Sequence, residues 1–496
     1  MEFSLFSASA VFPGALPHPV FIMTSLGPIF ADDLARVKPG DRLRLTISAQ
    51  TSDAAALAQA ALEARARGER VLVVCADPAD VPRLAQEMPW FEPKLDVRPL
   101  PDWETLPYDV LSPQEELVSE RLEALYRLTA PTGGADVLLT SAVTASQRLS
   151  PVSYIGANTF FFHQGEQISL TTLQKRLAAA GYANVKQVLA AGEFAVRGSI
   201  VDVFPMGSER PFRLDFFDDE IESIRWFDVD TQRSMESAEE IRLLPGHEFP
   251  VDPEALLAFR QRWRREFAGD PKKSIVYCDI EKEILPPGIE YYLPLFFDET
   301  AALTDYLPPN ARVFLLGDIE AALQAFGRDM ASRYKVLAAD PQRPALAPER
   351  IWLKPEEFFK SLANFARFTV EKKENAEDLK RLSGIEVDRK SQNPVGKLLE
   401  RTCESAMKGV RTLIAAPSAG RMETMSQLLR TGGLSVEEFP DWQTFLEADS
   451  SLSIAAAPLF SGAVFHHPEI VILSEAELYA ASPRRHRLRR VKHATT

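Results

Sequence analysis

Two arginines and a phenylalanine on two predicted strands have the types and spacing to bind another protein. Residues 212–217 read FRLDFF, and their alternation predicts a strand that sends Arg213 and Phe217 to its solvent face. The strand predicted at 194–197 places Arg197 on the corresponding face. An arginine beside an exposed aromatic side chain is typical of protein interfaces.

The same alternation also fits a purely structural role. In that interpretation Phe217 covers the edge of a sheet, and both arginines are solvated or pair with Asp215 or Asp218. The pattern of these strands alone leaves both interpretations open.

The composition is that of an ordinary globular protein. The chain has 496 residues, of which 46% are hydrophobic and 25% charged, so it is long enough for three or four domains. The formal charge of −14 repels nucleic acid. Contact with nucleic acid would therefore need a local basic patch, and the segment 484–492, with six Lys or Arg residues, is the candidate.

Neither a metal site nor a membrane segment is predicted. Cys75, Cys278 and Cys403 lie far apart, outside any zinc-binding spacing. Residues 1–22 are apolar but contain three prolines and no basic n-region, which is unlike a signal peptide or a membrane span. We therefore expect a cytoplasmic protein without a membrane partner.

The elements that must position these side chains alternate between strand and helix. A strand at 42–47, a helix at 53–67 capped by Ser52, and a continuous apolar strand at 71–75 predict a βαβ unit that opens a parallel sheet. From about residue 159 the period changes to that of strands and hairpins, with a turn at Asp218-Asp219. The fold class is therefore α/β, with an inserted α+β domain.

The chain is predicted to have seven parts. They are an N-terminal extension without order (1–30), the first part of an α/β domain (31–158), an inserted α+β domain (159–245), the second part of the α/β domain (246–369), a polar linker (370–393), a further small α/β domain (394–482) and a basic tail (483–496).

The loop after the first strand lies where a nucleotide-binding protein has its phosphate-binding loop. Such a loop needs glycines for close backbone approach and a lysine for the terminal phosphates. This loop has neither, and its last residue adds a negative charge: Ser48, Ala49, Gln50, Thr51, Ser52 and Asp53. We expect no bound nucleotide and no ATP hydrolysis here.

No other catalytic arrangement is predicted. Val313–Leu316 followed by Asp318 is similar to a magnesium-binding strand of an ATPase, but Asp318 is better explained as the N-cap of a helix at 319–326. The histidines, serines and cysteines form no recognisable nucleophile motif. The pattern favours a binding module.

Several long motifs, in order, resemble the bacterial transcription-repair coupling factor family, Mfd. They are DWETLPYD at 102–109, GEFAVRGSIVDVFPMGSERPFRLDFFDDEI at 192–221, LLPGHEFP at 243–250 and GIEYYLPLFF at 288–297. The resemblance runs from about residue 40 to 480. It implies the N-terminal module of that family, which is similar to the excision-repair protein UvrB: a helicase-like parallel-sheet domain with a degenerate P-loop, an inserted UvrA-binding domain and a further α/β domain.

The resemblance also implies functional residues and a role. Residues in the A-x-R-G and R-L-D-F-F strands contact UvrA in the family, and they match Arg197, Arg213 and Phe217. The implied function is transcription-coupled nucleotide excision repair, in which the module recruits UvrA to RNA polymerase stalled at DNA damage.

The remaining family functions are expected to need domains other than those predicted here. They are binding to RNA polymerase and an ATP- and magnesium-dependent translocase on double-stranded DNA, so no cofactor and no catalytic residue are predicted within these 496 residues. Two alternatives stay open: a UvrB-like protein that binds damaged DNA, and a residual nucleotide hydrolase.

Overall fold

The computed structural model describes residues 36–130, 134–388 and 390–479. The predicted N-terminal extension (1–30) and basic tail (483–496) therefore lie outside the described residues. The described chain forms two compact units, one ending at Lys380 and one beginning at Arg381.

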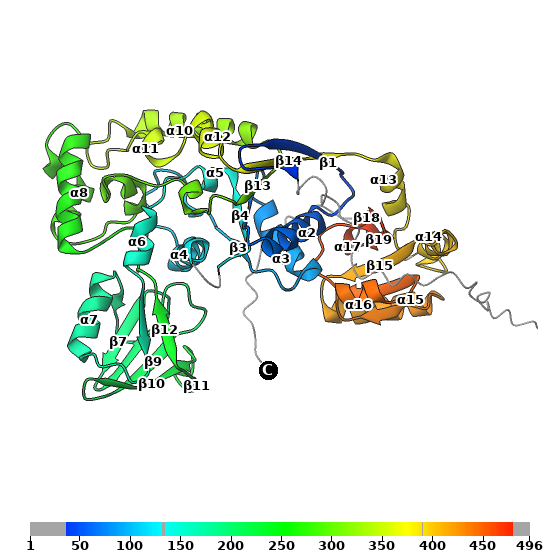
Figure 1. The fold of residues 1–496 in the computed structure, drawn as a ribbon, viewed down its shortest axis with the longest axis horizontal. Helices are drawn as coiled ribbons and strands as arrows, with labels where there is room; N and C mark the ends of the chain where they lie inside the picture. The colour runs from blue at the N-terminus through cyan, green and yellow to red at the C-terminus, as the bar shows by residue number, and fades with distance from the viewer. Residues whose placement is uncertain (1–35, 131–133, 389, 480–496) are drawn as a thin grey trace, which may run out of the picture. The chain divides into compact units, whose positions relative to one another are not determined.

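The first unit is built around six parallel strands (Figure 1). Their order across the sheet is β1 (Arg42–Ser48), β14 (Ala366–Lys373), β13 (Arg312–Leu316), β2 (Val71–Cys75), β4 (Val137–Ser141) and β3 (Val97–Pro99). The interior strands β13, β2 and β4 are buried along their whole length, which explains their continuous apolar sequences. The predicted parallel sheet is confirmed, but β14 and β13 separate the two strands of the predicted βαβ unit.

Two helices next to this sheet begin at the capping residues that the sequence predicts. Ser52 accepts a hydrogen bond from Ala55 N (3.2 Å) at the start of α2 (Asp53–Ala66). Asp318 accepts one from Ala321 N (2.9 Å) at the start of α10 (Ile319–Leu337). The carboxylate of Asp318 is thus used as a helix cap, as its sequence context predicts.

The stretch 370–393 is less of a linker than its composition suggests. Residues 370–373 are the end of β14, with Val370 buried, and Ala376–Leu382 forms α13. This part of the linker prediction is wrong, because β14 is apolar only in its first half and carries charge towards its carboxyl end. The domain boundaries themselves stay predictions.

The inserted segment forms a domain whose sheet is antiparallel except for one short pair of strands at its edge. A ribbon of β5 (Phe160–His163) and β12 (Glu240–Leu243) connects it to the rest of the unit. Its main sheet has the order β11 (Ser234–Ala238), β10 (Glu220–Phe227), β9 (Phe212–Phe217), β8 (Ile200–Val203), β7 (Glu193–Arg197) and β6 (Ala183–Asn184), next to α7 (Leu170–Ala179) (Figure 1). The predicted hairpin at Asp218-Asp219 is confirmed as the turn between β9 and β10.

The remaining part of the first unit is helical and aromatic. It contains α8 (Pro253–Glu266), α9 (Ile275–Glu281) and a 3₁₀ helix at Ile289–Leu295. Their buried faces meet around Phe259, Trp263 and Tyr277. This cluster is a second core beside the sheet.

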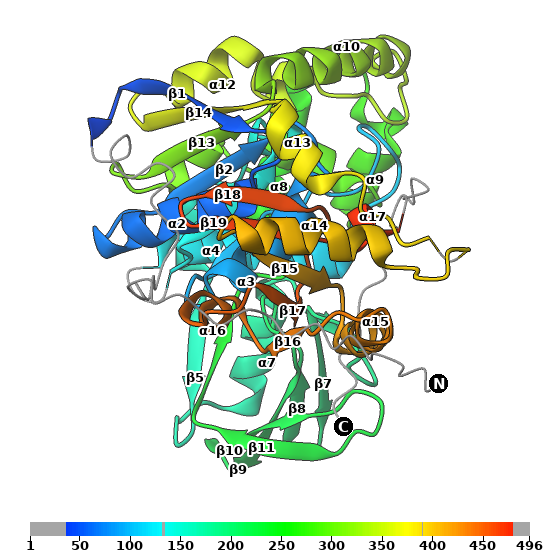
Figure 2. The same ribbon diagram turned by 90° about the vertical axis from the view of Figure 1, so that its right-hand side faces the viewer.

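The second unit is a mixed five-stranded sheet, seen with its helices in Figure 2. Its order is β16 (Glu437–Phe439), β17 (Leu452–Ala456), β15 (Arg411–Ala416), β19 (Glu469–Leu473) and β18 (Ala463–His466), and only β18 is antiparallel to its neighbour. The helices around it are α14 (Gly396–Met407), α15 (Ala419–Thr431) and α16 (Trp442–Glu447). The predicted small α/β fold is therefore present.

Candidate functional site

Phe217 is the most exposed large apolar side chain of the inserted domain in the described chain. It ends β9 and is 69% exposed. Asp218, which follows it, has a positive φ of 52° in the tight turn, and Glu220 lies directly opposite Phe217 on β10. The turn therefore presents an aromatic ring to solvent among acidic residues, an arrangement that suits an anchor in a protein interface.

Arg213 is held by a buried acid. Its Nε and Nη2 donate to the two carboxylate oxygens of Asp202 on β8 (2.7 and 2.9 Å), and Asp202 is 1% exposed. The hydrogen bond to Asp202 is the main reason why the pKa of Arg213 lies above its ordinary value. The partner is neither Asp215, which accepts from Ser223 Oγ (2.9 Å), nor Asp218, so the pairing expected in the structural interpretation is wrong.

Arg197 lies at the exposed end of β7 and donates to the backbone oxygen of Lys186 (3.1 Å). The register places Arg197 on the same face as Arg213 and Phe217, because Arg197 pairs with Ile200 and Ile200 with Asp215. The sheet thus brings the three predicted residues onto one face, with β8 between Arg197 and the other two.

The middle of this face is not open to solvent. Ala195, Val188 and Phe227 form a small buried cluster on it, against which Val185 and Phe204 pack. The predicted solvent face is therefore covered by apolar side chains at its centre. The two exposed residues of the predicted site, Arg197 and Phe217, lie at its margin.

Asp202 is the residue of this site that the sequence did not reveal. It stands in the strand IVDV, where a lone acid among apolar residues was a signal. Its partner follows only from the register between β8 and β9, which sets Asp202 opposite Arg213.

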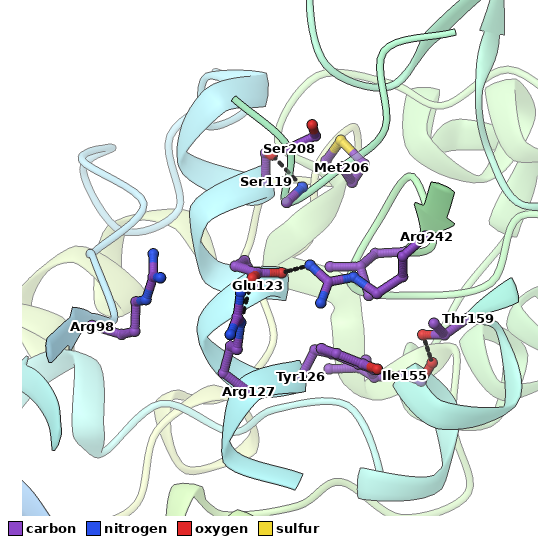
Figure 3. Close-up of polar contacts among 12 residues, drawn as sticks. Arg98, Ser119, Glu123, Tyr126, Arg127, Ile155, Thr159, Met206, Ser208 and Arg242 are labelled. Carbon is purple, nitrogen blue, oxygen red and sulfur yellow. Dashed lines mark hydrogen bonds and ion pairs between the residues drawn. The ribbon is translucent and has the colours of Figure 1, made fainter. Parts of the chain in front are cut away.

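The junction between the inserted domain and α4 (Glu115–Thr129) is polar (Figure 3). Glu123 on α4 pairs with Arg242 on β12 and with Arg127 (2.7 Å). The backbone N–H of Gly207 donates to Ser119 Oγ (2.7 Å). Gly207 has a φ of +77°, and a Cβ there would lie 2.6 Å from a Glu123 carboxylate oxygen. A close backbone approach thus fixes the inserted domain on α4.

The motifs at 102–109, 243–250 and 288–297 meet in one buried place. Glu248, 3% exposed, accepts from Arg121 Nε (2.5 Å) and Nη2 (3.1 Å) and from Trp103 Nε1 (3.2 Å). Tyr291 packs edge-on against Trp103 with ring centroids 5.4 Å apart. These motifs thus build a buried support next to the end of the inserted domain.

Glu290, at the edge of the same region, is partly buried. Burial raises its pKa to about 7, although Ser112 Oγ donates to its Oε2 (2.8 Å). A carboxyl whose pKa is raised in the folded state binds its proton more tightly there, so it stabilises the fold at low pH. This contribution is lost as the pH rises through about 7.

Glu290→Gln is therefore expected to stabilise the chain at pH 8 by about 1–3 kcal/mol and to flatten the fall in stability above about pH 5. Thermal unfolding of the two proteins between pH 5 and pH 8 checks this. The exposed Glu222→Gln is the matched control and should follow the wild type. Equal pH slopes for Glu290→Gln and wild type would contradict the prediction.

The position of the degenerate phosphate loop is filled by the chain itself. Ser48 Oγ donates to Asp378 Oδ2 (2.7 Å), and Ser52 caps α2. Burial acts to raise the pKa of Asp53, but ion pairs with Arg83 and Lys372 outweigh it and hold this pKa below its ordinary value. Neither cation was predicted, since both lie far from residues 48–53 in the sequence.

Two further properties concern the described residues only. They contain no group of three or more His, Cys, Asp or Glu side chains arranged to hold a metal ion. In the same residues no helix combines the length and apolar character needed to cross a membrane.

Comparison with known proteins agrees with this arrangement. Residues 160–249 match the UvrB interaction domain, and residues 406–478 match the Mfd D3 domain. A parallel six-stranded sheet that carries a UvrB interaction domain, followed by an Mfd D3 domain, defines the class of this chain as an α/β protein with these two domains.

Two individual relatives identify the family to which the chain belongs. The chain is 38% identical to the transcription-repair-coupling factor of Escherichia coli (strain K12) over 367 residues, or 72% of this chain and 31% of the relative. It is 37% identical to that of Haemophilus influenzae over 394 residues, or 77% and 34%. The chain thus belongs to the transcription-repair-coupling factor (Mfd) family, whose N-terminal region it matches, and it spans about a third of the length of these relatives.

Proposed function

We propose that this chain recruits UvrA in transcription-coupled nucleotide excision repair, through the margin of the inserted sheet. Phe217 is the observation that carries the proposal: an aromatic side chain 69% exposed, within the segment that matches the UvrB interaction domain. Exposing such a ring is unfavourable in water, and its burial by a partner removes that penalty.

The three residues have different parts in the proposed contact. Phe217 is the apolar anchor, and Arg197, exposed at the end of β7, supplies charge-assisted hydrogen bonds to acidic groups of UvrA. Arg213 donates from its Nε and Nη2 to Asp202, and its Nη1 donates to Gln232 O (3.1 Å) and Ser234 Oγ (3.3 Å). Arg213 therefore shapes the surface as well as adding charge to it.

Arg213→Ala is expected to weaken the fold as well as the contact. It leaves the carboxylate of Asp202 buried without its cation, and breaking such a pair lowers the free energy of unfolding by about 3 kcal/mol. Denaturant unfolding should show this loss for Arg213→Ala and none for Arg197→Ala, whose side chain is exposed. Adding Asp202→Asn to Arg213→Ala should recover part of the lost stability. If nothing is recovered, the pair of Arg213 and Asp202 does not contribute to the stability of the fold.

The wider role is proposed from the family. It includes RNA polymerase, double-stranded DNA, ATP and magnesium as partners and cofactors of other family domains, with no nucleotide bound at residues 48–53. Because the repair reaction acts on chromosomal DNA, we propose a cytoplasmic location.

Titration of UvrA into the purified chain tests the proposal. Saturable binding that Phe217→Ala removes, without a change in the circular dichroism spectrum, supports it. Absence of binding by the intact chain would overturn it. DNA and ATP titrated separately test the two alternatives, a UvrB-like DNA-binding protein and a residual nucleotide hydrolase.

A further inference from the structure

An anion lies at the start of α2, and the chain itself provides it. The carboxylate of Asp53 is 3% exposed. Its Oδ1 accepts from Ala54 N (3.0 Å) and Arg83 Nη1 (2.8 Å), and its Oδ2 accepts from Arg83 Nη2 (2.8 Å) and Lys372 Nζ (2.7 Å). Both oxygens are therefore satisfied by donors, two of which are cationic.

The donors come from three different elements. Ala54 belongs to α2, Arg83 to α3 (Asp80–Phe91), and Lys372 to the carboxyl end of β14. Asp53 also lies at the carboxyl edge of the parallel sheet, where it is the first residue of α2, a helix of 14 residues. Nucleotide-binding α/β folds hold a phosphate at this position, on the first N–H groups of the helix.

The charges around Arg83 indicate which anions could take the position of the Asp53 carboxylate. Arg83 also pairs with Asp80 (2.7 Å) and Glu87 (2.8 Å). The cluster thus holds three carboxylates and two cations, and removing Asp53 would leave it with equal numbers of both. A small monoanion would restore the original charge, whereas a phosphate dianion would add a charge next to Asp80 and Glu87.

We propose that Asp53 is an intramolecular ligand, whose carboxylate occupies an anion site formed by Arg83, Lys372 and the first turn of α2. The site is closed to phosphate groups by an occupant, in addition to lacking glycine and lysine in its loop. This inference is independent of UvrA recruitment, since it concerns a different domain and a different chemistry.

Chemical rescue of Asp53→Ala tests it, with formate as the probe. The variant should melt several degrees below wild type in chloride. Formate at the same ionic strength should raise its melting temperature clearly more than that of wild type, because formate replaces the missing carboxylate. Asp53→Ala/Arg83→Ala is the matched control, and formate should act on it only as on wild type. Equal formate effects in all three proteins would overturn the proposal.

Phosphate and pyrophosphate form a second arm of the experiment. They are expected to rescue Asp53→Ala less than formate does, and to leave wild type unchanged apart from the general salt effect. Saturable binding of pyrophosphate to wild type, lost in Arg83→Ala, would show that the site is open and would contradict the proposal.

Asp53→Asn keeps the test decisive if the alanine variant does not fold. The amide keeps the volume of the carboxylate and removes its charge. A lowered melting temperature at pH 7, with the difference from wild type shrinking as the pH falls towards the range where Asp53 protonates, supports an ionised internal ligand. A melting temperature equal to that of wild type at pH 7 would overturn it.

Discussion

Glu248→Ala is expected to lower the free energy of unfolding of the first unit by about 3–5 kcal/mol. Glu248 accepts two hydrogen bonds from Arg121, whose side chain is fully buried, and one from Trp103. Arg121 also donates to Pro101 O (2.7 Å) and Gln147 Oε1 (2.9 Å). Without Glu248 a buried guanidinium keeps these neutral partners but loses its counter-charge, which is why the expected effect is large.

Urea unfolding of the full chain measures this effect as a shift in the unfolding transition of the first unit. The matched control is Glu371→Ala, which breaks the ion pair between Arg44 and Glu371 on the surface of the same unit, where the side chains are 73% and 38% exposed. That change should alter stability by less than about 1 kcal/mol. If Glu248→Ala were no less stable than Glu371→Ala, the buried pair would not be the support that we infer.

Phe217→Ala is expected to weaken binding to UvrA by about 30-fold or more, or about 2 kcal/mol, and to leave the fold intact. The side chain is 69% exposed, so its removal opens no cavity in the folded chain. The whole effect should therefore appear in the affinity and none in the melting temperature.

Isothermal titration of UvrA measures the affinity, and Leu189→Ala is the matched control. Leu189 is 61% exposed in the same domain, next to β7 rather than at the turn after β9. Unchanged binding by Leu189→Ala shows that the loss is specific to Phe217. If both variants bind as wild type does, the apolar anchor lies elsewhere.

The sequence predicts individual strands and helices better than it predicts which of them lie side by side. Strands such as Val71–Cys75 and caps such as Ser52 depend on local patterns, and the structure has them where the patterns place them. The insertion of β14 and β13 between β1 and β2 depends on contacts between residues about 240 to 320 positions apart, which no local pattern encodes.

The same distinction applies to the candidate site. The exposure of Phe217 follows from strand alternation, which is a local property. The partners of Arg213 and Asp53 do not, because Asp202, Arg83 and Lys372 are selected by register and by helix packing. Exposed side chains can therefore be predicted from the local sequence, whereas the partners in buried ion pairs cannot.

The ribbon of β5 and β12 has a consequence for how such a chain arose. Phe160 and Leu243 are register partners, so the inserted domain begins and ends at neighbouring points. A gene segment encoding this sheet could enter or leave there while the surrounding parallel strands kept their order. The inserted domain, with any partner it binds, could then evolve separately from the parallel-sheet domain that carries it.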